Sequence, residues 1–110
     1  MPEIVDLLAA DGRGPLYGTA TEDLNVTLLS WAPGDRIAEH VNEERDVLLV
    51  VLAGGGTLTV DDAESDLRTG VATVFPKGAR RGIVAGPAGV RYLTAHLRRG
   101  PLTIERAAAN

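Results

Sequence analysis

Histidine and arginine are the side chains in this sequence with the clearest capacity for chemistry. The chain contains two histidines, His40 and His96, and no cysteine. A histidine transfers protons near neutral pH or binds a metal ion, whereas an arginine such as Arg81 is a permanent cation suited to a carboxylate. Proton transfer, metal binding and anion binding are therefore the chemistries to weigh.

Two other catalytic signatures can be set aside. No serine lies in a recognisable nucleophile motif, and Gly54-Gly55-Gly56 lacks the lysine and the following helix of a phosphate-binding loop. We therefore expect these three glycines to form a tight turn that needs positive φ angles.

The elements that would position these side chains are short strands. Apolar or alternating segments separated by turn residues are typical of a β-sandwich or barrel. We expect about eight strands, at 24–31, 36–41, 47–52, 57–60, 71–75, 82–85, 90–97 and 102–105. The expected turns between them include Pro33-Gly34, Asn42-Glu43-Glu44, the triple glycine, Asp61-Asp62, Pro76-Lys77-Gly78 and Gly86-Pro87-Ala88-Gly89.

The first 23 residues have a different pattern. Apolar residues at positions 4, 5, 7 and 8 have helical spacing, but Gly12, Gly14 and Pro15 follow within about two turns, so at most one short helix is expected. A chain of 110 residues can bury one core and is too short for two. We expect one domain, 1–110, with an N-terminal arm at 1–23 and a barrel at 24–105.

Two spacings carry a resemblance to a known family. Gly34 is followed after five residues by His40-Val41-Asn42, and Gly70 after five residues by Pro76-Lys77-Gly78, two residues and Arg81. Over roughly residues 25–97, these spacings and the strand order resemble the cupin superfamily. Its first motif is glycine, five residues, His-x-His, a spacer, an acid and a later glycine; its second is glycine, five residues, Pro-x-Gly, two residues and histidine. The resemblance implies an all-β, cupin-type double-stranded β-helix, a single-domain jelly-roll barrel.

The motif positions of this chain depart from the family pattern. In the family, two histidines of the first motif, the acid and the histidine of the second motif face the barrel interior and bind a divalent metal. His40 matches the first ligand, whereas Asn42 and Arg81 stand at the other histidine positions. The acidic position falls on Asp46 when counted from Asn42 and on Val47 when counted back from the triple glycine, and a β-bulge would turn Asp46 inward.

This set of residues favours an anion over a metal ion. An amide oxygen is a poor ligand for Fe²⁺, Mn²⁺ or Zn²⁺, and a guanidinium has no lone pair and repels a divalent ion. We therefore predict no metal cofactor and a polar pocket in which Arg81 pairs with Asp46 and bonds with His40 and Asn42. Arg81 would orient a small carboxylate or enol, and His40 would transfer a proton.

Three alternatives stay open. The same residues would form a satisfied buried network that only holds strands together. A metal-dependent cupin enzyme, such as an oxygenase or isomerase, would use His40 and Asp46 as ligands, with Glu44 or His96 as further donors. A barrel without a ligand would serve as an assembly or regulatory partner through the apolar segment 47–52.

Alternation along the strands predicts the orientation of further side chains. His96 should face outward, because the apolar phase of its strand is the other one, Leu93, Ala95 and Leu97. Trp31 is expected to pack in the core or at the barrel mouth. Arg80 should point away from Arg81 into solvent.

The apolar segment 47–52 indicates a second copy of the chain as a partner. The run V-L-L-V-V-L is apolar on both faces, so both need cover, and we expect a homodimer.

The charged side chains are unevenly distributed. Residues 1–66 hold 14 acidic and 3 basic side chains, and residues 67–110 hold 1 acidic and 8 basic side chains. The basic residues are scattered and aromatic residues are few, which argues against nucleic-acid binding. With no apolar run near ~20 residues and no secretory signal pattern, we expect a soluble, cytoplasmic protein without a membrane partner.

Overall fold

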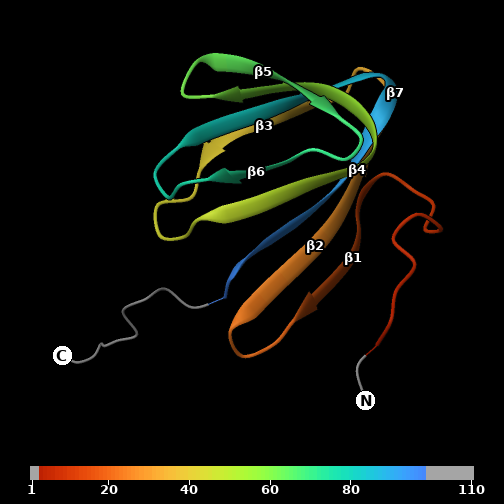
Figure 1. Cartoon of the computed structure of the whole chain (residues 1–110), viewed down its shortest axis with the longest axis vertical. Helices are drawn as coiled ribbons and strands as arrows, with labels where there is room; N and C mark the ends of the chain where they lie inside the picture. The colour runs from red at the N-terminus through yellow and green to blue at the C-terminus, as the bar shows by residue number, and fades with distance from the viewer. Residues whose placement is uncertain (1–2, 99–110) are drawn as a thin grey trace.

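The computed structural model describes residues 3–98, excluding the side chains of Glu39 and His40. Seven antiparallel strands make up this part of the chain (Figure 1). They are β1 (Gly14–Ala20), β2 (Leu24–Trp31), β3 (Arg36–Val41), β4 (Val47–Val60), β5 (Ala63–Arg68), β6 (Ala72–Phe75) and β7 (Arg80–Leu97). The predicted all-β jelly-roll fold is confirmed.

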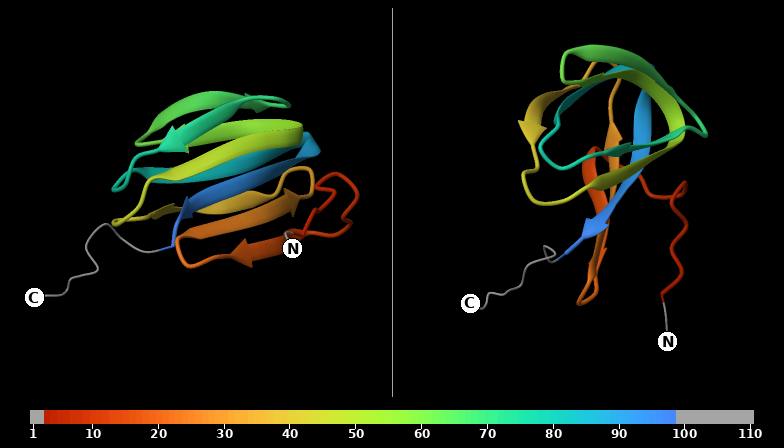
Figure 2. Two further views of the ribbon diagram at one scale, coloured as in Figure 1. Left: turned by 60° about the horizontal axis from the view of Figure 1, so that its bottom comes forward. Right: turned by 60° about the vertical axis from the view of Figure 1, so that its left-hand side comes forward.

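The strands form two layers because β4 and β7 are long enough to belong to both (Figure 2). In one layer the order is β1-β2-β7-β4-β6, and residues 90–96 of β7 pair with residues 47–54 of β4. In the other layer the order is β3-β7-β4-β5, and residues 81–85 of β7 pair with residues 56–60 of β4. The space between the layers holds the core.

The bend of β4 lies at the triple glycine, where the prediction of a tight turn is wrong. The strand continues through these residues, with register shifts between Val51 and Ala53 and between Gly54 and Gly56. Only Gly54 of the three has a positive φ, of 70°. A Cβ on Gly55 would overlap the carbonyl oxygen of Leu67, and one on Gly56 would overlap that of Val84. Close backbone approach therefore requires glycine at positions 55 and 56, and the positive φ favours glycine at position 54.

Several predicted elements have the observed bounds and others do not. The strands 24–31 and 36–41 and the turn at Asp61-Asp62 are confirmed, and both aspartates have positive φ. The turn predicted at 86–89 is wrong, because β7 runs through it. β1 and β5 were not predicted, and the strand predicted at 102–105 lies outside the described residues.

The N-terminal arm forms a turn at residues 7–9 in place of the short helix that its spacing allowed. Asp6 holds this turn, because its carboxylate accepts a hydrogen bond from the Leu8 amide at 3.0 Å. The Arg91 guanidinium of β7 donates to the carbonyls of Leu7 and Ala10 at 3.1 and 2.6 Å, which ties the arm to the sheet. Within residues 3–98, no helix is long and apolar enough to cross a bilayer.

The core fills the space between the layers and comes from alternate residues of each strand. Its buried members are Val47, Leu49, Val51, Leu58, Leu67, Phe75, Ile83, Ala85, Val90 and Tyr92. The intervening residues of β4 and β6 face outward, and there Leu48 is 40% exposed and Val74 is 56% exposed. Segment 47–52 is therefore apolar on both faces, as the sequence indicated.

The predicted orientation of the last strand segment is wrong. Tyr92 is buried and Thr94 lines the barrel interior, whereas Leu97 is 56% exposed. The pairing of His96 with Val47, whose side chain is in the core, places His96 in the inward phase. The more polar phase of this strand faces inward because it lines a cavity.

Candidate functional site

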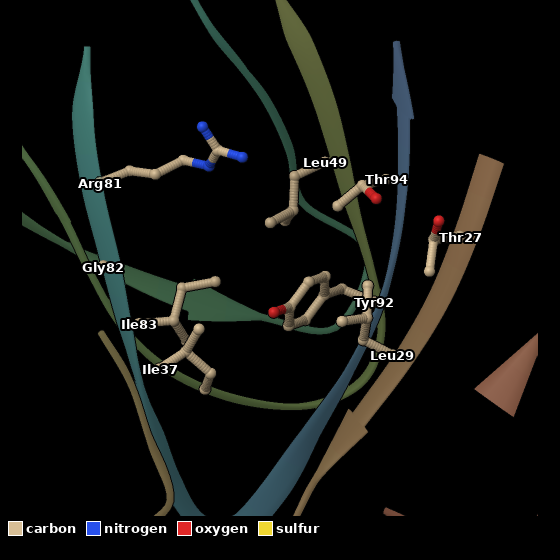
Figure 3. A pocket seen from close by; sticks show the side chains of 9 residues that line it. All are labelled: Thr27, Leu29, Ile37, Leu49, Arg81, Gly82, Ile83, Tyr92 and Thr94. Carbon is tan, nitrogen blue, oxygen red and sulfur yellow. The ribbon is translucent and has the colours of Figure 1, made fainter. Parts of the chain in front are cut away.

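A cavity of about 230 Å³ lies between the two layers of the barrel (Figure 3). Its wall combines apolar side chains with a few polar ones. The lining residues are Thr27, Leu29, Ile37, Leu49, Arg81, Gly82, Ile83, Tyr92 and Thr94. Pairing between β2, β7 and β4 sets three of them in a row, because Thr27 lies opposite Thr94 and Thr94 opposite Leu49.

Arg81 is the charged group among the described side chains of this cavity. It begins the inward phase of β7, and its guanidinium extends from that wall toward the middle of the space (Figure 3). The guanidinium carbon lies 4.9 Å from the centroid of the buried Phe75 ring, a cation–π contact that fixes its position. Its neighbour Arg80 is exposed, as predicted.

The charge of Arg81 lacks a counter-ion among the side chains that the structure describes. The ion pairs found there join Arg13 to Asp35 and Arg45 to Glu44. Desolvation of the half-buried guanidinium lowers the pKa of Arg81, and nearby Tyr92 opposes this shift. An arginine nevertheless keeps its charge in proteins, so the cavity carries a partly desolvated positive charge.

Trp31 and Tyr92 meet beside the cavity. The indole Nε1 of Trp31 donates a hydrogen bond of 2.9 Å to the Tyr92 hydroxyl oxygen. Burial raises the pKa of Tyr92, while the Trp31 hydrogen bond and the Arg81 charge act in the opposite direction. Tyr92 is therefore a neutral phenol at physiological pH. Trp31 packs against the core, as expected from its position.

The structure pairs the backbones of His40 and Arg81 but places Asn42 and Asp46 outside the cavity wall. The backbone of His40 pairs with that of Arg81 between β3 and β7, and the His40 side chain lies outside the described part. The Asn42 amide oxygen accepts hydrogen bonds from the backbone amides of Glu44 and Arg45, at 3.1 and 3.2 Å. Asn42 thereby holds the turn between β3 and β4 and does not belong to the cavity lining.

Asp46 also lies away from the cavity wall. Its carboxylate is exposed and accepts a hydrogen bond of 2.9 Å from the Lys77 backbone amide. It borders a separate depression that Glu44 and Leu97 also line. Val47 takes the inward position, since it is buried and pairs with Phe75. Asp46 precedes Val47, the first paired residue of β4, and the described ion pairs do not join it to Arg81.

The described residues do not fit a divalent metal ion. Within residues 3–98, apart from the side chains of Glu39 and His40, no three histidine or acidic side chains converge in a way that would hold one. The amide oxygen of Asn42 accepts a hydrogen bond within its own turn, and the Arg81 guanidinium lies in the cavity. A divalent metal ion would need imidazole or carboxylate ligands where Arg81 and Asn42 stand.

The sequence interpretation missed most of the cavity wall. Thr27, Leu29, Tyr92 and Thr94 come from β2 and β7, outside both motif spacings. The signal that could have found them is the paired alternation of these strands, in which threonines and a tyrosine share one phase. That phase was assigned to solvent because it is the more polar one.

Comparisons with known proteins agree with this architecture. The family profile described as "Cupin domain" matches residues 27–96. The dimethylsulfoniopropionate lyase DddW of Ruegeria pomeroyi is 33% identical over 93 residues, covering 74% of this chain and 60% of that protein. The chain thus spans about 60% of the length of this curated relative.

Solved structures show the same fold at low identity. TT1209 from Thermus thermophilus has a TM-score of 0.76 at 24% identity, over 87% of this chain and 97% of that one. A conserved Klebsiella pneumoniae protein with a double-stranded β-helix domain has a TM-score of 0.77 at 18% identity, over 88% and 90%.

Proposed function

Because this chain belongs to the cupin domain family, we propose that its barrel is a binding pocket for a small organic carboxylate. The observation that carries the proposal is the Arg81 guanidinium. It is half-buried, held over Phe75, and without a carboxylate partner among the described side chains. A ligand carboxylate would supply the missing counter-ion through paired N–H···O bonds.

The cavity also limits the size of the ligand. A volume of about 230 Å³ is below the roughly 300–1,000 Å³ of pockets for drug-sized molecules, so the ligand is a short-chain compound. Leu29, Ile37 and Leu49 would contact its carbon chain. The hydroxyls of Thr27 and Thr94 offer further hydrogen bonds on the opposite wall.

The curated relative supports a ligand of this class. Its name describes a lyase that acts on dimethylsulfoniopropionate, a short carboxylate that also carries a dimethylsulfonium cation. Lyase activity of the present chain is a second candidate function, with His40 as the proton-transfer group that the sequence predicts. The test of this activity incubates dimethylsulfoniopropionate with wild type or with His40→Ala and monitors its consumption by proton NMR. Consumption by wild type alone would support the lyase, and no consumption would exclude it for this substrate.

The binding proposal is tested by thermal shift with a panel of short carboxylates. A ligand at about 100 times its Kd stabilises the folded state by about 2.7 kcal/mol, or roughly 10 °C for a chain of this size. We expect Arg81→Gln to abolish the shift and Arg80→Gln, at the exposed neighbouring arginine, to retain it. Equal shifts in wild type and Arg81→Gln would remove Arg81 from the site.

We also propose that the chain forms a homodimer through the outward face of β4 and β6. Leu48 and Val74 are paired on this face and are both substantially exposed. Exposed apolar surface of this kind is commonly covered by a second subunit, and a two-fold interface would place each patch against its copy.

A further inference from the structure

The Trp31–Tyr92 hydrogen bond fixes the direction in which Tyr92 can donate. An indole N–H is a donor only, so the Tyr92 oxygen must be the acceptor at this contact. The phenolic hydrogen is therefore not used by Trp31 and needs an acceptor of its own. Among the side chains that the structure describes, none accepts it.

The side chains around the Tyr92 hydroxyl explain why none of them accepts its hydrogen. The Tyr92 ring reaches across the cavity, and its oxygen points toward Ile83 and Ile37 (Figure 3). Neither side chain can accept a hydrogen bond. Tyr92 is 4% exposed, so bulk water has little access from outside the barrel. A buried donor without an acceptor is unfavourable, and the open space available to it is the cavity itself.

We propose that Tyr92 donates its hydroxyl hydrogen to a second oxygen of the ligand, so that the pocket selects short carboxylates bearing a neutral acceptor oxygen. Oxo acids and hydroxy acids belong to this class. This inference rests on the proposed function, because Arg81 binds the carboxylate while Tyr92 recognises the other oxygen. Trp31 is a positioning residue that acts through Tyr92.

The two groups are suited to different parts of such a ligand. Arg81 is charged and extends from the first half of β7, whereas Tyr92 is neutral and comes from its second half, across the cavity. A charged group strongly prefers the carboxylate, and a neutral phenol is left for the carbonyl or hydroxyl oxygen. A plain alkyl acid would satisfy Arg81 and leave the Tyr92 donor unpaired.

The test compares butanoate with 2-oxobutanoate and 3-hydroxybutanoate, acids with the same carbon chain. Trp31 is the only tryptophan of the chain, so its fluorescence reports on binding beside Tyr92. We expect wild type to bind at least one oxygen-bearing acid roughly tenfold more tightly than butanoate, the penalty of one unmade buried hydrogen bond. Tyr92→Phe should lose this preference and keep its affinity for butanoate.

The matched control is Tyr17→Phe, the same substitution at the other tyrosine, which bonds to Glu3 outside the cavity. This variant should keep the preference. If Tyr92→Phe does not fold, wild type with tyrosine isotope-labelled at Cζ gives the same answer by NMR. The Tyr92 resonance should shift with the oxygen-bearing acid and not with butanoate.

The outcomes separate this inference from the proposal beneath it. If butanoate and the oxygen-bearing acids bind equally, or if Tyr92→Phe keeps the preference, the role of Tyr92 is overturned and the carboxylate pocket stands. If Arg81→Gln keeps full affinity while Tyr92→Phe loses the preference, the role of Tyr92 is supported and the binding of the carboxylate by Arg81 is overturned. If no acid binds to wild type, both are overturned.

Discussion

The Arg81 guanidinium lies 4.9 Å from the centroid of the Phe75 ring, so a core aromatic residue supports the one charged side chain that the structure describes in the cavity wall. Phe75 is 1% exposed, so its ring is packed on all sides by the core. The charge is thus held in place by packing within the described structure.

Replacing Phe75 should therefore weaken both packing and the position of Arg81. We expect Phe75→Leu to lower the free energy of unfolding by about 1–2 kcal/mol. Combined with Arg81→Gln in a double-mutant cycle, it should show a coupling energy of about 0.5–1 kcal/mol by urea denaturation. The cycle with Arg80→Gln should be additive. Additivity in both cycles would mean that the ring does not hold the guanidinium.

The glycine bend of β4 gives a steric prediction. A Cβ at Gly56 would overlap the Val84 carbonyl oxygen, so Gly56→Ala should destabilise the fold by more than about 3 kcal/mol or prevent folding. Gly18→Ala is the control, because its Cβ would lie 3.7 Å from the nearest atom, the Val26 carbonyl oxygen. That change should alter stability by less than about 0.5 kcal/mol. Similar melting temperatures for the two variants would contradict the close approach.

The raised pKa of Tyr92 predicts a pH dependence of stability. Burial makes the folded protein hold the phenolic proton more tightly than the unfolded chain does. The resulting stability is fully present below the ordinary tyrosine pKa of 10.0 and is lost as pH rises from there toward the folded value. In urea unfolding at alkaline pH, the free energy of unfolding of Tyr92→Phe should decrease less with rising pH than that of wild type or Tyr17→Phe. An equal decrease in all three proteins would exclude Tyr92 as its origin.

The outward face of β4 and β6 predicts the oligomeric state. Leu48→Lys places a charge on the proposed interface and should convert a homodimer into a monomer. Light scattering after size exclusion measures the mass directly. Glu64→Lys on β5 is the control, because Glu64 is exposed on the other layer. A wild-type monomer at high concentration would overturn the proposed dimer.

Metal content tests the cofactor prediction. Protein purified without an affinity tag is incubated with Fe²⁺, Mn²⁺, Ni²⁺ or Zn²⁺, and metal per chain is measured for wild type and His40→Ala. We expect well under one ion per chain in both, because Arg81 stands in the cavity. One ion per wild-type chain, lost in His40→Ala, would favour the metal-dependent enzyme instead.

Local rules recovered part of the fold from the sequence. β2 and β3 end just before residues typical of turns, Pro33-Gly34 and Asn42, and here these residues do end the strands, so the bounds were predictable. The strand conformation of Gly54-Gly55-Gly56 and of residues 86–89 was not predictable, because the sequence does not distinguish a glycine needed for close backbone approach from one needed for a turn. β5 was missed because it is mostly exposed and polar, with Leu67 as its buried residue.

The site was harder to predict than the fold. Motif spacing found Arg81, whose position in the cavity follows from the turn before β7. It could not reveal that Asn42 bonds to its own turn, since that depends on backbone amides that spacing does not describe. The inward phase at Tyr92 and Thr94 was also misassigned, because a cavity reverses the usual rule that the apolar phase faces inward.

The continuity of β4 and β7 through both layers limits how the barrel can admit a ligand. Because the same two strands build both walls, the layers cannot slide or hinge apart as independent bodies without breaking those strands. Ligand entry then leaves the two layers in place. The turns at Asn42 and Gly78 are also joined to each other, by a backbone hydrogen bond of 2.8 Å. The volume of the cavity should therefore stay at about 230 Å³ whether or not a ligand is bound.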